Sequence, residues 1–375
     1  MPLIKNLSTG GVMKRILFLI LAAALLYSCS SQKEIIKKEE KLPETIEKKN
    51  PFRLSIEIQK SKTNSSLRGI SVVDSLTAWA CGSKGTFIHT SDGGRTWIEG
   101  KVKGFEPLDF RGIKAFDKNT AIIMSVDAPA FFFKTYDAGK TWKRKYINRN
   151  AKIFFDGMVF WDDKNGIAFS DPIDGNFFIV VTKDGGENWK ENSSINIPSA
   201  LQHEGAFAAS GTAIAVSGKD LVWFGCGGAD RSRIYFSEDG GENWRAFEAP
   251  IKSGNSSSGV FSVCFKDDLN GIAVGGDYKN DNNIIGNCAL SDDGGLSWQA
   301  IDKSQPNGFR SCVVWNDKYN FYLTTGTSGS DYSLDDSKTW TLIDKNGYNS
   351  IGISKKDGGC FMVGDNGVVA KVRVK

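Results

Sequence analysis

The sequence predicts an all-β fold, a seven-bladed β-propeller of four-stranded blades closed by an N-terminal strand. Three observations favour this fold: an eight-residue motif occurs six times, short β-type runs fill the intervals, and seven runs could each form the inner strand of a blade. The composition agrees, because 41 glycines suit many tight turns and only 9 prolines are present to interrupt strands.

The repeated motif, which we call the octet, begins with threonine or serine, has aspartate at its third position and ends in tryptophan. Its aspartates are Asp92, Asp137, Asp184, Asp239, Asp293 and Asp335, and successive aspartates lie 42 to 55 residues apart. A period of this length, filled with short strands, indicates propeller blades.

In the first copy, "TSDGGRTW" (Thr90–Trp97), the octet fits the turn between the third and fourth strands of a blade. The two glycines supply the positive φ angles of the turn. The Asp92 carboxylate and the Thr90 hydroxyl are expected to accept N–H groups that lack a strand partner. Trp97 is expected to bury its ring against a neighbouring blade, with an acceptor for its indole N–H. We therefore interpret the six aspartates as structural.

Seven runs are expected to form the inner strands, which line the central channel. They are Leu67–Val73, Phe110–Phe116, Phe155–Trp161, His203–Ser210, Ser258–Phe265, Phe309–Trp315 and Asn349–Ser354. The last unit, Tyr348–Lys375, contains only three runs. Phe52–Lys60 is expected to supply its outer strand, so that no open sheet edge remains where the ring closes.

Residues 1–29 predict a lipoprotein signal peptide. Lys14 and Arg15 precede an apolar run, and the stretch Leu26–Cys29 resembles the bacterial lipoprotein box, whose cysteine is lipidated. A plain secretory signal with a chance cysteine is the alternative. Residues 30–50 carry six lysines and five glutamates and predict a charged tether to the propeller, residues 51–375. The protein is thus expected to be exported and lipid-anchored through Cys29 in the cell envelope, at the outer membrane or the periplasmic face.

Composition and motifs argue against several classes of function. The formal net charge is only +4, so no basic field for nucleic acid is expected. With two histidines and no paired-cysteine spacing, no metal site is expected. The six cysteines of the propeller are interpreted as small buried residues, with oxidation in an exported chain as the alternative. No glycine-rich phosphate loop opens a helix, so no cofactor is expected.

Five residues at the starts of the predicted inner strands are candidates for a ligand site at one mouth of the channel. They are Arg68, Arg111, Asp156, Glu204 and Arg310. Guanidinium groups grip carboxylate or phosphate, so one hypothesis is a pocket for an anionic or sugar-acid group. The other hypothesis is a ring of salt bridges that plugs the channel. Loops over the same mouth add second-rank candidates: Asp171, Asp230, Arg231, Asp277 and Tyr278.

The octet is identified as the Asp-box (BNR repeat), of pattern [ST]-x-D-x-G-x-[TSN]-W; five copies match it, and the last has Ser337 for the glycine. The chain resembles the photosystem II stability and assembly-factor-like propellers of non-photosynthetic bacteria and, more distantly, the sialidases. The first resemblance implies seven blades and an arginine patch, and "EGAFAASGTAIAV" (Glu204–Val216) is similar to a segment of those relatives. The second implies an arginine triad and a tyrosine nucleophile, although "PFRLS" (Pro51–Ser55) only partly matches the sialidase Phe/Tyr-Arg-Ile-Pro motif.

These features favour a membrane-anchored scaffold that binds a protein or glycan partner in the envelope, because no complete catalytic set is visible. The alternative is a glycan-active enzyme of sialidase type, in which Tyr278, Glu204 and Asp156 would take the roles of nucleophile, activating carboxylate and acid. A third hypothesis follows relatives labelled oxidoreductases, but no cofactor-binding element supports it.

Overall fold

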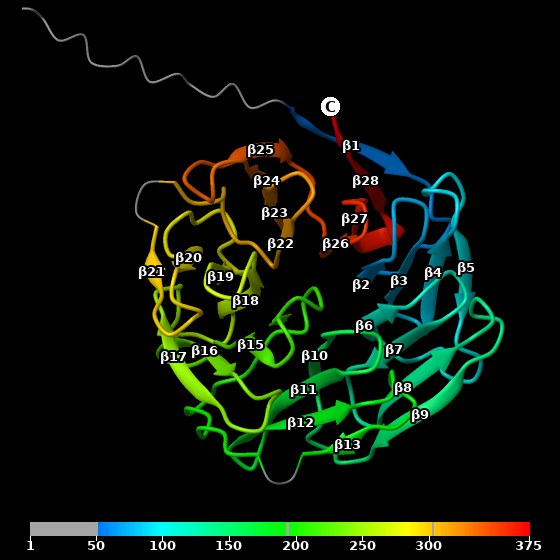
Figure 1. Cartoon of the computed structure of the whole chain (residues 1–375), viewed down its shortest axis with the longest axis horizontal. Helices are drawn as coiled ribbons and strands as arrows, with labels where there is room; N and C mark the ends of the chain where they lie inside the picture. Colours follow the sequence, from blue (N-terminus) through cyan, green and yellow to red (C-terminus); the bar gives the residue numbers. More distant parts are fainter. Residues whose placement is uncertain (1–51, 193–194, 302–303) are drawn as a thin grey trace, which may run out of the picture. The chain divides into compact units, whose positions relative to one another are not determined.

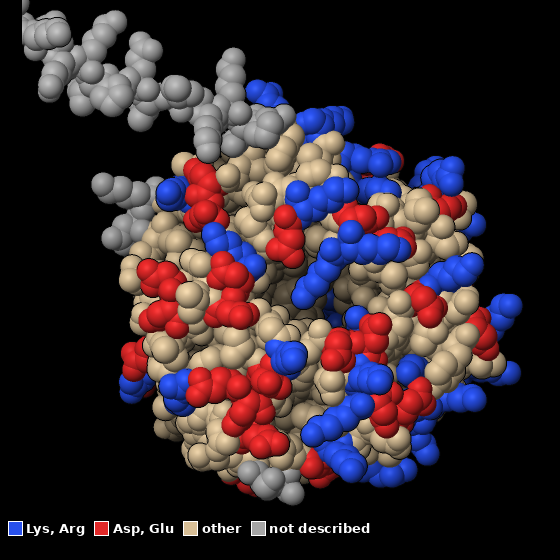
Figure 2. All heavy atoms as spheres, in the orientation of Figure 1, with Lys and Arg blue, Asp and Glu red and all other residues tan. Residues whose placement is uncertain are grey.

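The computed structural model describes residues 52–192, 195–301 and 304–375. They form seven four-stranded antiparallel sheets, arranged as blades around a ring (Figure 1). One face of the ring is hollowed at its centre, with lysine and arginine side chains beside the hollow (Figure 2). The predicted signal peptide, Cys29 and the tether lie outside the described residues. Within the described ranges, no helix is long and apolar enough to cross a membrane.

Six blades each use four consecutive strands, ordered from the channel to the outer edge. Blade 1 is β2 (Leu67–Val72), β3 (Ala78–Gly82), β4 (Thr86–Thr90) and β5 (Ile98–Lys101). Blade 2 is β6 (Phe110–Ala115), β7 (Ala121–Ser125), β8 (Ala130–Thr135) and β9 (Lys143–Asn148). Blade 3 is β10 (Phe155–Phe160), β11 (Gly166–Ile173), β12 (Asn176–Thr182) and β13 (Lys190–Glu191).

The same order continues around the ring. Blade 4 is β14 (Ile214–Ser217), β15 (Leu221–Gly225), β16 (Ser232–Ser237) and β17 (Arg245–Ala249). Blade 5 is β18 (Ser258–Phe265), β19 (Gly271–Asp277), β20 (Cys288–Ser291) and β21 (Gln299–Ala300). Blade 6 is β22 (Cys312–Asn316), β23 (Phe321–Gly326), β24 (Gly329–Ser333) and β25 (Thr341–Asp344).

Blade 7 joins the two ends of the propeller. It consists of β26 (Ser350–Ile353), β27 (Cys360–Val363), β28 (Val369–Val374) and, at the outer edge, β1 (Leu54–Gln59), with the short 3-10 helix η1 (Asp365–Gly367) between β27 and β28. β1 pairs antiparallel with the whole of β28, from Leu54 opposite Val374 to Gln59 opposite Val369. The predicted closure by an N-terminal strand is therefore confirmed.

The predicted inner strand of blade 4 is wrong. The inner strand is β14, whereas residues 203–213, which we call the crossing segment, leave the blade and run across the centre of the ring. Backbone bridges join Gly205 to Gly227 and Gly227 to Gly259. Glycine is required there, because a Cβ on Gly227 would lie 2.4 Å from the Gly259 Cα. The alternating pattern of this run resembles a strand, but its backbone partners lie in other loops.

The octets occupy the turns between the third and fourth strands, as predicted, and all six make the same hydrogen bonds. In the first copy, the Thr96 N–H donates to Asp92 Oδ1 (2.9 Å), the Thr96 hydroxyl donates to Oδ2 (2.6 Å), and the Gly94 N–H donates to Thr90 Oγ1 (3.0 Å). The N–H to Oδ1 distance is 2.8 to 2.9 Å in every copy. The structural interpretation of these aspartates agrees with this geometry.

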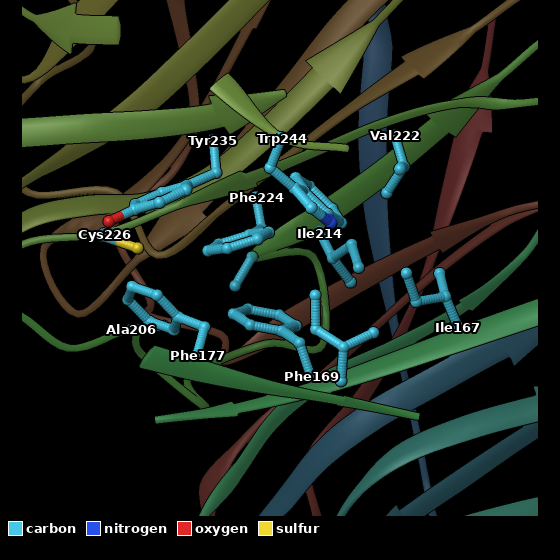
Figure 3. Packing of buried hydrophobic residues seen from close by; sticks show 12 residues of the cluster. Ile167, Phe169, Phe177, Ala206, Ile214, Val222, Phe224, Cys226, Tyr235 and Trp244 are labelled. Atoms are coloured by element: carbon cyan, nitrogen blue, oxygen red, sulfur yellow. The ribbon is translucent and has the colours of Figure 1, made fainter. Parts of the chain in front are cut away.

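The octet tryptophans pack into hydrophobic clusters together with side chains of the preceding blade. Figure 3 shows such a cluster, in which Phe224 and Trp244 of blade 4 face Phe169 and Phe177 of blade 3. The expected acceptor for the indole N–H is confirmed for Trp97, Trp244 and Trp298. The indole nitrogens of Trp142, Trp189 and Trp340 have no partner among the described residues. These tryptophans hold neighbouring blades together mainly by apolar contact.

All six described cysteines are free thiols, and only Cys264 is less than fully buried. They lie in or beside strands of five blades, with Cys264 and Cys288 both in blade 5, as expected for small buried residues. Among the described residues, no group of three or more histidine, cysteine, aspartate or glutamate side chains is placed to hold a metal ion.

Candidate binding site at the channel mouth

A β-bulge shapes the start of four inner strands. The pairing register shifts by one residue in β2, β6, β10 and β18, and the extra residues are Arg68, Arg111, Asp156 and Phe261. A bulge re-aims the extra side chain away from the regular pleat. Because the four bulges occupy the same position in their blades, these side chains gather at one end of the channel, which we call the mouth.

The glycine after the bulge is a sequence signal for this geometry. In blades 1 to 3 the bulged residue is followed by Gly69, Gly112 or Gly157. A Cβ on Gly69 would lie 2.7 Å from the Arg111 carbonyl oxygen and from the Cys81 sulfur. The inner strands are therefore packed too closely here for any larger residue.

Arg111 is held firmly at the mouth. Its Nε and Nη2 contact Asp109 Oδ2 at 2.9 and 2.8 Å, and its Nη1 donates to the Ala208 carbonyl oxygen at 3.0 Å. About a fifth of each side chain of the ion pair stays exposed, 23% for Arg111 and 22% for Asp109. Asp109, which the sequence analysis did not single out, thus holds Arg111 in place. Arg111 in turn holds the crossing segment through Ala208.

Arg68 differs from Arg111 because it has no ion pair or hydrogen bond among the described residues. Its side chain is half-buried. Burial and the charge of Arg111 lower the pKa of Arg68, while the charges of Asp365 and Asp109 oppose this effect. Asp365 is already engaged by Ser66 and Asn349. The mouth therefore contains one guanidinium group whose charge is poorly compensated.

Asp156 and Asp171 form a pair of close carboxyl groups beside the arginines. Asp156 is 1% exposed, and neither of its carboxyl oxygens has a hydrogen-bond partner among the described residues. Burial, followed by the Asp171 charge, raises the pKa of Asp156 well above its usual value. Burial also raises the pKa of Asp171 to about 6, although its Oδ1 accepts the Ala206 N–H at 2.9 Å. Burial thus favours the neutral form of Asp156, and Asp171 holds the crossing segment.

Glu204 is not at the start of an inner strand, which corrects the prediction. It lies on the crossing segment, and its side chain is fully buried. Arg233 of β16 binds both carboxylate oxygens, and Glu204 Oε2 also accepts the Leu201 N–H at 2.8 Å. The ion pair therefore anchors the crossing segment to its own blade.

Arg310 is completely buried, as is its partner Asp331 on β24. Its Nε donates to Asp331 Oδ2 at 2.9 Å, and its Nη1 donates to the Phe309 carbonyl oxygen and the Ser328 hydroxyl, each at 2.8 Å. Arg310 consequently offers no exposed guanidinium surface with Arg68 and Arg111. No sequence signal predicts Asp331 as the partner of Arg310, because the two residues meet only when β22 and β24 join the same sheet.

The crossing segment closes the channel behind the mouth. The Ser210 hydroxyl donates to the Ser311 carbonyl oxygen (2.8 Å), the Ser350 hydroxyl donates to the Ser210 carbonyl oxygen (2.6 Å), and Thr212 and Ser262 share a hydrogen bond (2.7 Å). With the Arg111 and Asp171 bonds, the segment is tied to blades 2, 3, 5, 6 and 7. The hypothetical salt-bridge ring is not formed, because each arginine ion pair stays within one blade.

Of the second-rank candidates, only Asp171 contacts a first-rank residue. Arg231 pairs with Glu248 at the surface, and Asp230 is exposed. Asp277 accepts the Ser257 hydroxyl at 2.7 Å and organises its own loop. Tyr278 is 44% exposed and packs edge-on against Phe261 and Phe309. With Glu204 held by Arg233 and Asp156 buried, only Tyr278 of the three groups considered for sialidase chemistry is exposed.

Comparisons with known proteins show what this ring is similar to. A family model described as "Photosynthesis system II assembly factor YCF48" matches residues 50–153. A curated relative, the "Photosystem II assembly lipoprotein Ycf48" of Synechococcus sp. (strain CC9902), is 26% identical over 253 residues, which make up 65% of each chain. The match thus spans slightly less than two thirds of that relative's own length.

Solved structures agree on the fold. "YCF48 bound to D1 peptide" superposes with a TM-score of 0.61 at 16% identity, covering 85% of this chain and 96% of the other. YCF48 from Cyanidioschyzon merolae gives 0.58 at 16% identity, covering 84% and 98%. A GH74 xyloglucanase from Xanthomonas campestris gives 0.55 at 14% identity, covering 85% of this chain but 53% of the enzyme. At these identities the likeness concerns the fold alone.

Proposed function

We propose that this propeller, which is similar to the photosystem II assembly factors, binds a segment of a protein partner at the channel mouth, where Arg68 and Arg111 grip a carboxylate of that segment. The observation that carries the proposal is the half-buried Arg68, which has no counter-ion among the described residues and lies beside a second arginine. An anion bound between them would offset both the burial and the repulsion.

The arrangement of the two arginines suits a planar anion. Arg111 is immobilised by Asp109 and by the Ala208 carbonyl oxygen, so it is preorganised. Arg68 keeps all its donors for a ligand, and a guanidinium group binds a carboxylate through two parallel hydrogen bonds. One fixed and one free arginine can therefore hold a peptide carboxylate, either a terminal one or that of an acidic side chain.

A peptide also accounts for the apolar surface beside the mouth. The loop after β19 exposes Tyr278 (44%), Ile284 (58%) and Ile285 (73%). Because Asp277 at the end of β19 pairs with Ser258 at the start of β18, this loop lies on the mouth side of the ring. Aromatic and aliphatic side chains next to a charged anchor are typical of protein-binding surfaces. A solved relative of the same fold is described as bound to a peptide.

Peptide binding tests the proposed function. The chain from Ser30 to Lys375 is titrated with an acidic peptide labelled at its N-terminus, and with the same peptide in amidated, Asn- and Gln-substituted form. Only the acidic form should bind, and Arg68→Ala should abolish binding without lowering the melting temperature. Arg68→Lys should bind weakly, because it keeps the charge but loses the fork.

The matched control is Arg95→Ala, which removes an exposed arginine from an octet turn. It should bind the acidic peptide as the unmodified chain does. Equal binding of the neutral peptide, or unchanged binding by Arg68→Ala, would contradict the proposal.

Lipid attachment at Cys29 is the second part of the proposed function. The charged leader and Leu26–Cys29 support it, as does the description of the curated relative as a lipoprotein. Expressed in a bacterium, the chain should incorporate labelled palmitate and partition into detergent, and Cys29→Ser should not be labelled. An unlabelled, freely soluble chain would refute the anchor and leave the mouth hypothesis untouched.

A further inference from the structure

A second, separate cavity occupies the body of the central channel. Its volume is about 660 Å³, within the range of roughly 300–1,000 Å³ typical of small-molecule sites. The inner strands of all seven blades line it, together with Gly211 and Thr212 of the crossing segment, whereas Arg68 and Arg111 do not. The cavity is therefore closed towards the mouth and approaches the other face of the ring, where the turns after the inner strands lie.

Aliphatic side chains form part of the wall of this cavity, and polar atoms line the rest. Val72, Val159, Val216, Val314 and Ile353 line it and are each partly exposed, and they come from five different blades. The Cys264 side chain of β18, the only described cysteine that is not fully buried, lines it as well. The aliphatic part of the wall favours contact with the apolar part of a guest, because removing both apolar surfaces from water is favourable.

The end of the cavity away from the mouth carries four lysines, and two of them, Lys114 and Lys355, have no close counter-ion among the described residues. Lys114 of β6 has its Nζ 3.7 Å from the largely exposed Asp163 and makes no shorter polar contact. Burial lowers the pKa of Lys114, Asp163 opposes this effect, and the charge of Lys355 lowers the pKa further. Lys355 is exposed and has no ion pair among the described residues, whereas Lys266 is bound to Asp336 at 2.6 Å. Asp163 and Asp317 are the carboxylates at the same opening.

We propose that this cavity binds a free amphiphile with one apolar chain and one anionic head, such as a fatty-acid anion. The chain lies against the valine and isoleucine wall, and the head group reaches Lys114 and Lys355 at the opening. The proposal goes beyond partner binding at the mouth, because the crossing segment separates the two sites. It also accounts for incompletely paired lysines at one end of a channel that has aliphatic side chains along its wall.

Calorimetric titration of the chain from Ser30 to Lys375 with dodecanoate, below its micelle concentration, tests the proposal. Dodecanoate should bind at one site per chain, and butyrate and dodecyltrimethylammonium should not. Val159→Phe and Val314→Phe fill the cavity and should abolish binding while the melting temperature stays close to that of the unmodified chain. Lys114→Gln combined with Lys355→Gln should weaken binding at least about tenfold, because both charge-assisted contacts to the head group are lost.

The matched control is Lys318→Gln, which neutralises a nearby exposed lysine that does not line the cavity. It should leave dodecanoate affinity unchanged. If the wall variants do not fold, 11-bromoundecanoate provides a second measurement: it should quench Trp315, which lines the opening, and Trp315→Phe should remove that quenching. No dodecanoate binding, or binding that survives both the wall variants and Lys114→Gln with Lys355→Gln, would overturn the proposal.

Discussion

The turn face of the ring and the channel mouth repeat in different ways. On the turn face, six octets repeat both the residues and their hydrogen bonds, so any one aspartate has the same partners as the others. At the mouth, four bulges repeat only the backbone, and their side chains are two arginines, an aspartate and a phenylalanine with different partners. Repetition of side-chain contacts indicates a structural role, whereas a repeated backbone with varied side chains leaves room for recognition.

Carboxylates respond to these two environments in opposite directions. Hydrogen bonds from Thr96 lower the pKa of Asp92 to about 2, and those from Thr141 do the same for Asp137. At the mouth, burial raises the pKa values of Asp156 and Asp171. The octet aspartates are stabilised as anions, and the mouth aspartates are stabilised as neutral acids. Each of the following experiments tests one side of this contrast.

The largest effect is expected from Asp331→Ala. Asp331 and Arg310 are both completely buried, so the substitution leaves an unpaired charge inside blade 6. The free energy of unfolding should fall by about 3–5 kcal/mol, measured by urea denaturation. The double variant Arg310→Met with Asp331→Leu should recover most of the loss. If Asp331→Ala left the free energy of unfolding unchanged, the buried ion pair between Arg310 and Asp331 would not stabilise blade 6.

Asp184→Ala tests whether the octet aspartates have a structural role that is separate from binding at the mouth. It removes the acceptor of the Asn188 N–H (2.9 Å) and of the Asn188 side chain (2.8 Å) in the third turn. The expected loss is about 1–3 kcal/mol in urea denaturation, with unchanged binding of the acidic peptide. Arg68→Ala should give the reverse result, lost binding at nearly full stability. Loss of peptide binding by Asp184→Ala at unchanged stability would break the contrast between the two regions.

The dependence of the melting temperature on pH should contain a contribution from the octet aspartates and a contribution of opposite sign from Asp171 at the mouth. The folded pKa of Asp171, about 6, lies above its ordinary value, so its contribution is complete below about pH 4 and is lost as the pH rises through 6. The lowered pKa values of the octet aspartates have the opposite effect, with stability lost as the pH falls from about 4 towards 2. The melting temperature should therefore be highest near pH 4–5. Asp171→Asn should flatten the slope between pH 4 and 7 without changing the acid side.

Ser337→Gly should have the smallest effect. In the last octet, Ser337 holds φ at 68°, and its buried hydroxyl has no hydrogen-bond partner, although its N–H still donates to Ser333 Oγ at 2.9 Å. Glycine adopts this conformation freely, so the melting temperature should rise, by an amount equivalent to about 1 kcal/mol. The reciprocal Gly186→Ser should destabilise, because its Cβ would lie 2.6 Å from the Ile122 side chain. A lower melting temperature for Ser337→Gly would contradict the interpretation that the positive φ of Ser337 is strained.

The architecture could be predicted from the sequence because its determinants are local. Each octet carries its own turn glycines, acceptors and tryptophan, and the spacing of the octets indicates the blades. The closing strand followed from a blade that lacked one run. The bulge residues Arg68, Arg111 and Asp156 could likewise be aligned, because a glycine follows each of them.

What the sequence determined was the number of blades, the turns and which residues begin most inner strands, since these depend on hydrogen bonds and packing within one repeat. Only the tertiary structure decided the partners at the mouth. Asp331 removed Arg310 from the surface, Arg233 engaged Glu204, and residues 203–213 crossed the ring instead of forming a strand. These contacts join residues from different strands and blades, and burial decides which charges remain free. No local pattern encodes that choice, which is why Arg68 could be identified as the arginine of the mouth without an ion pair among the described residues only once the ring had closed.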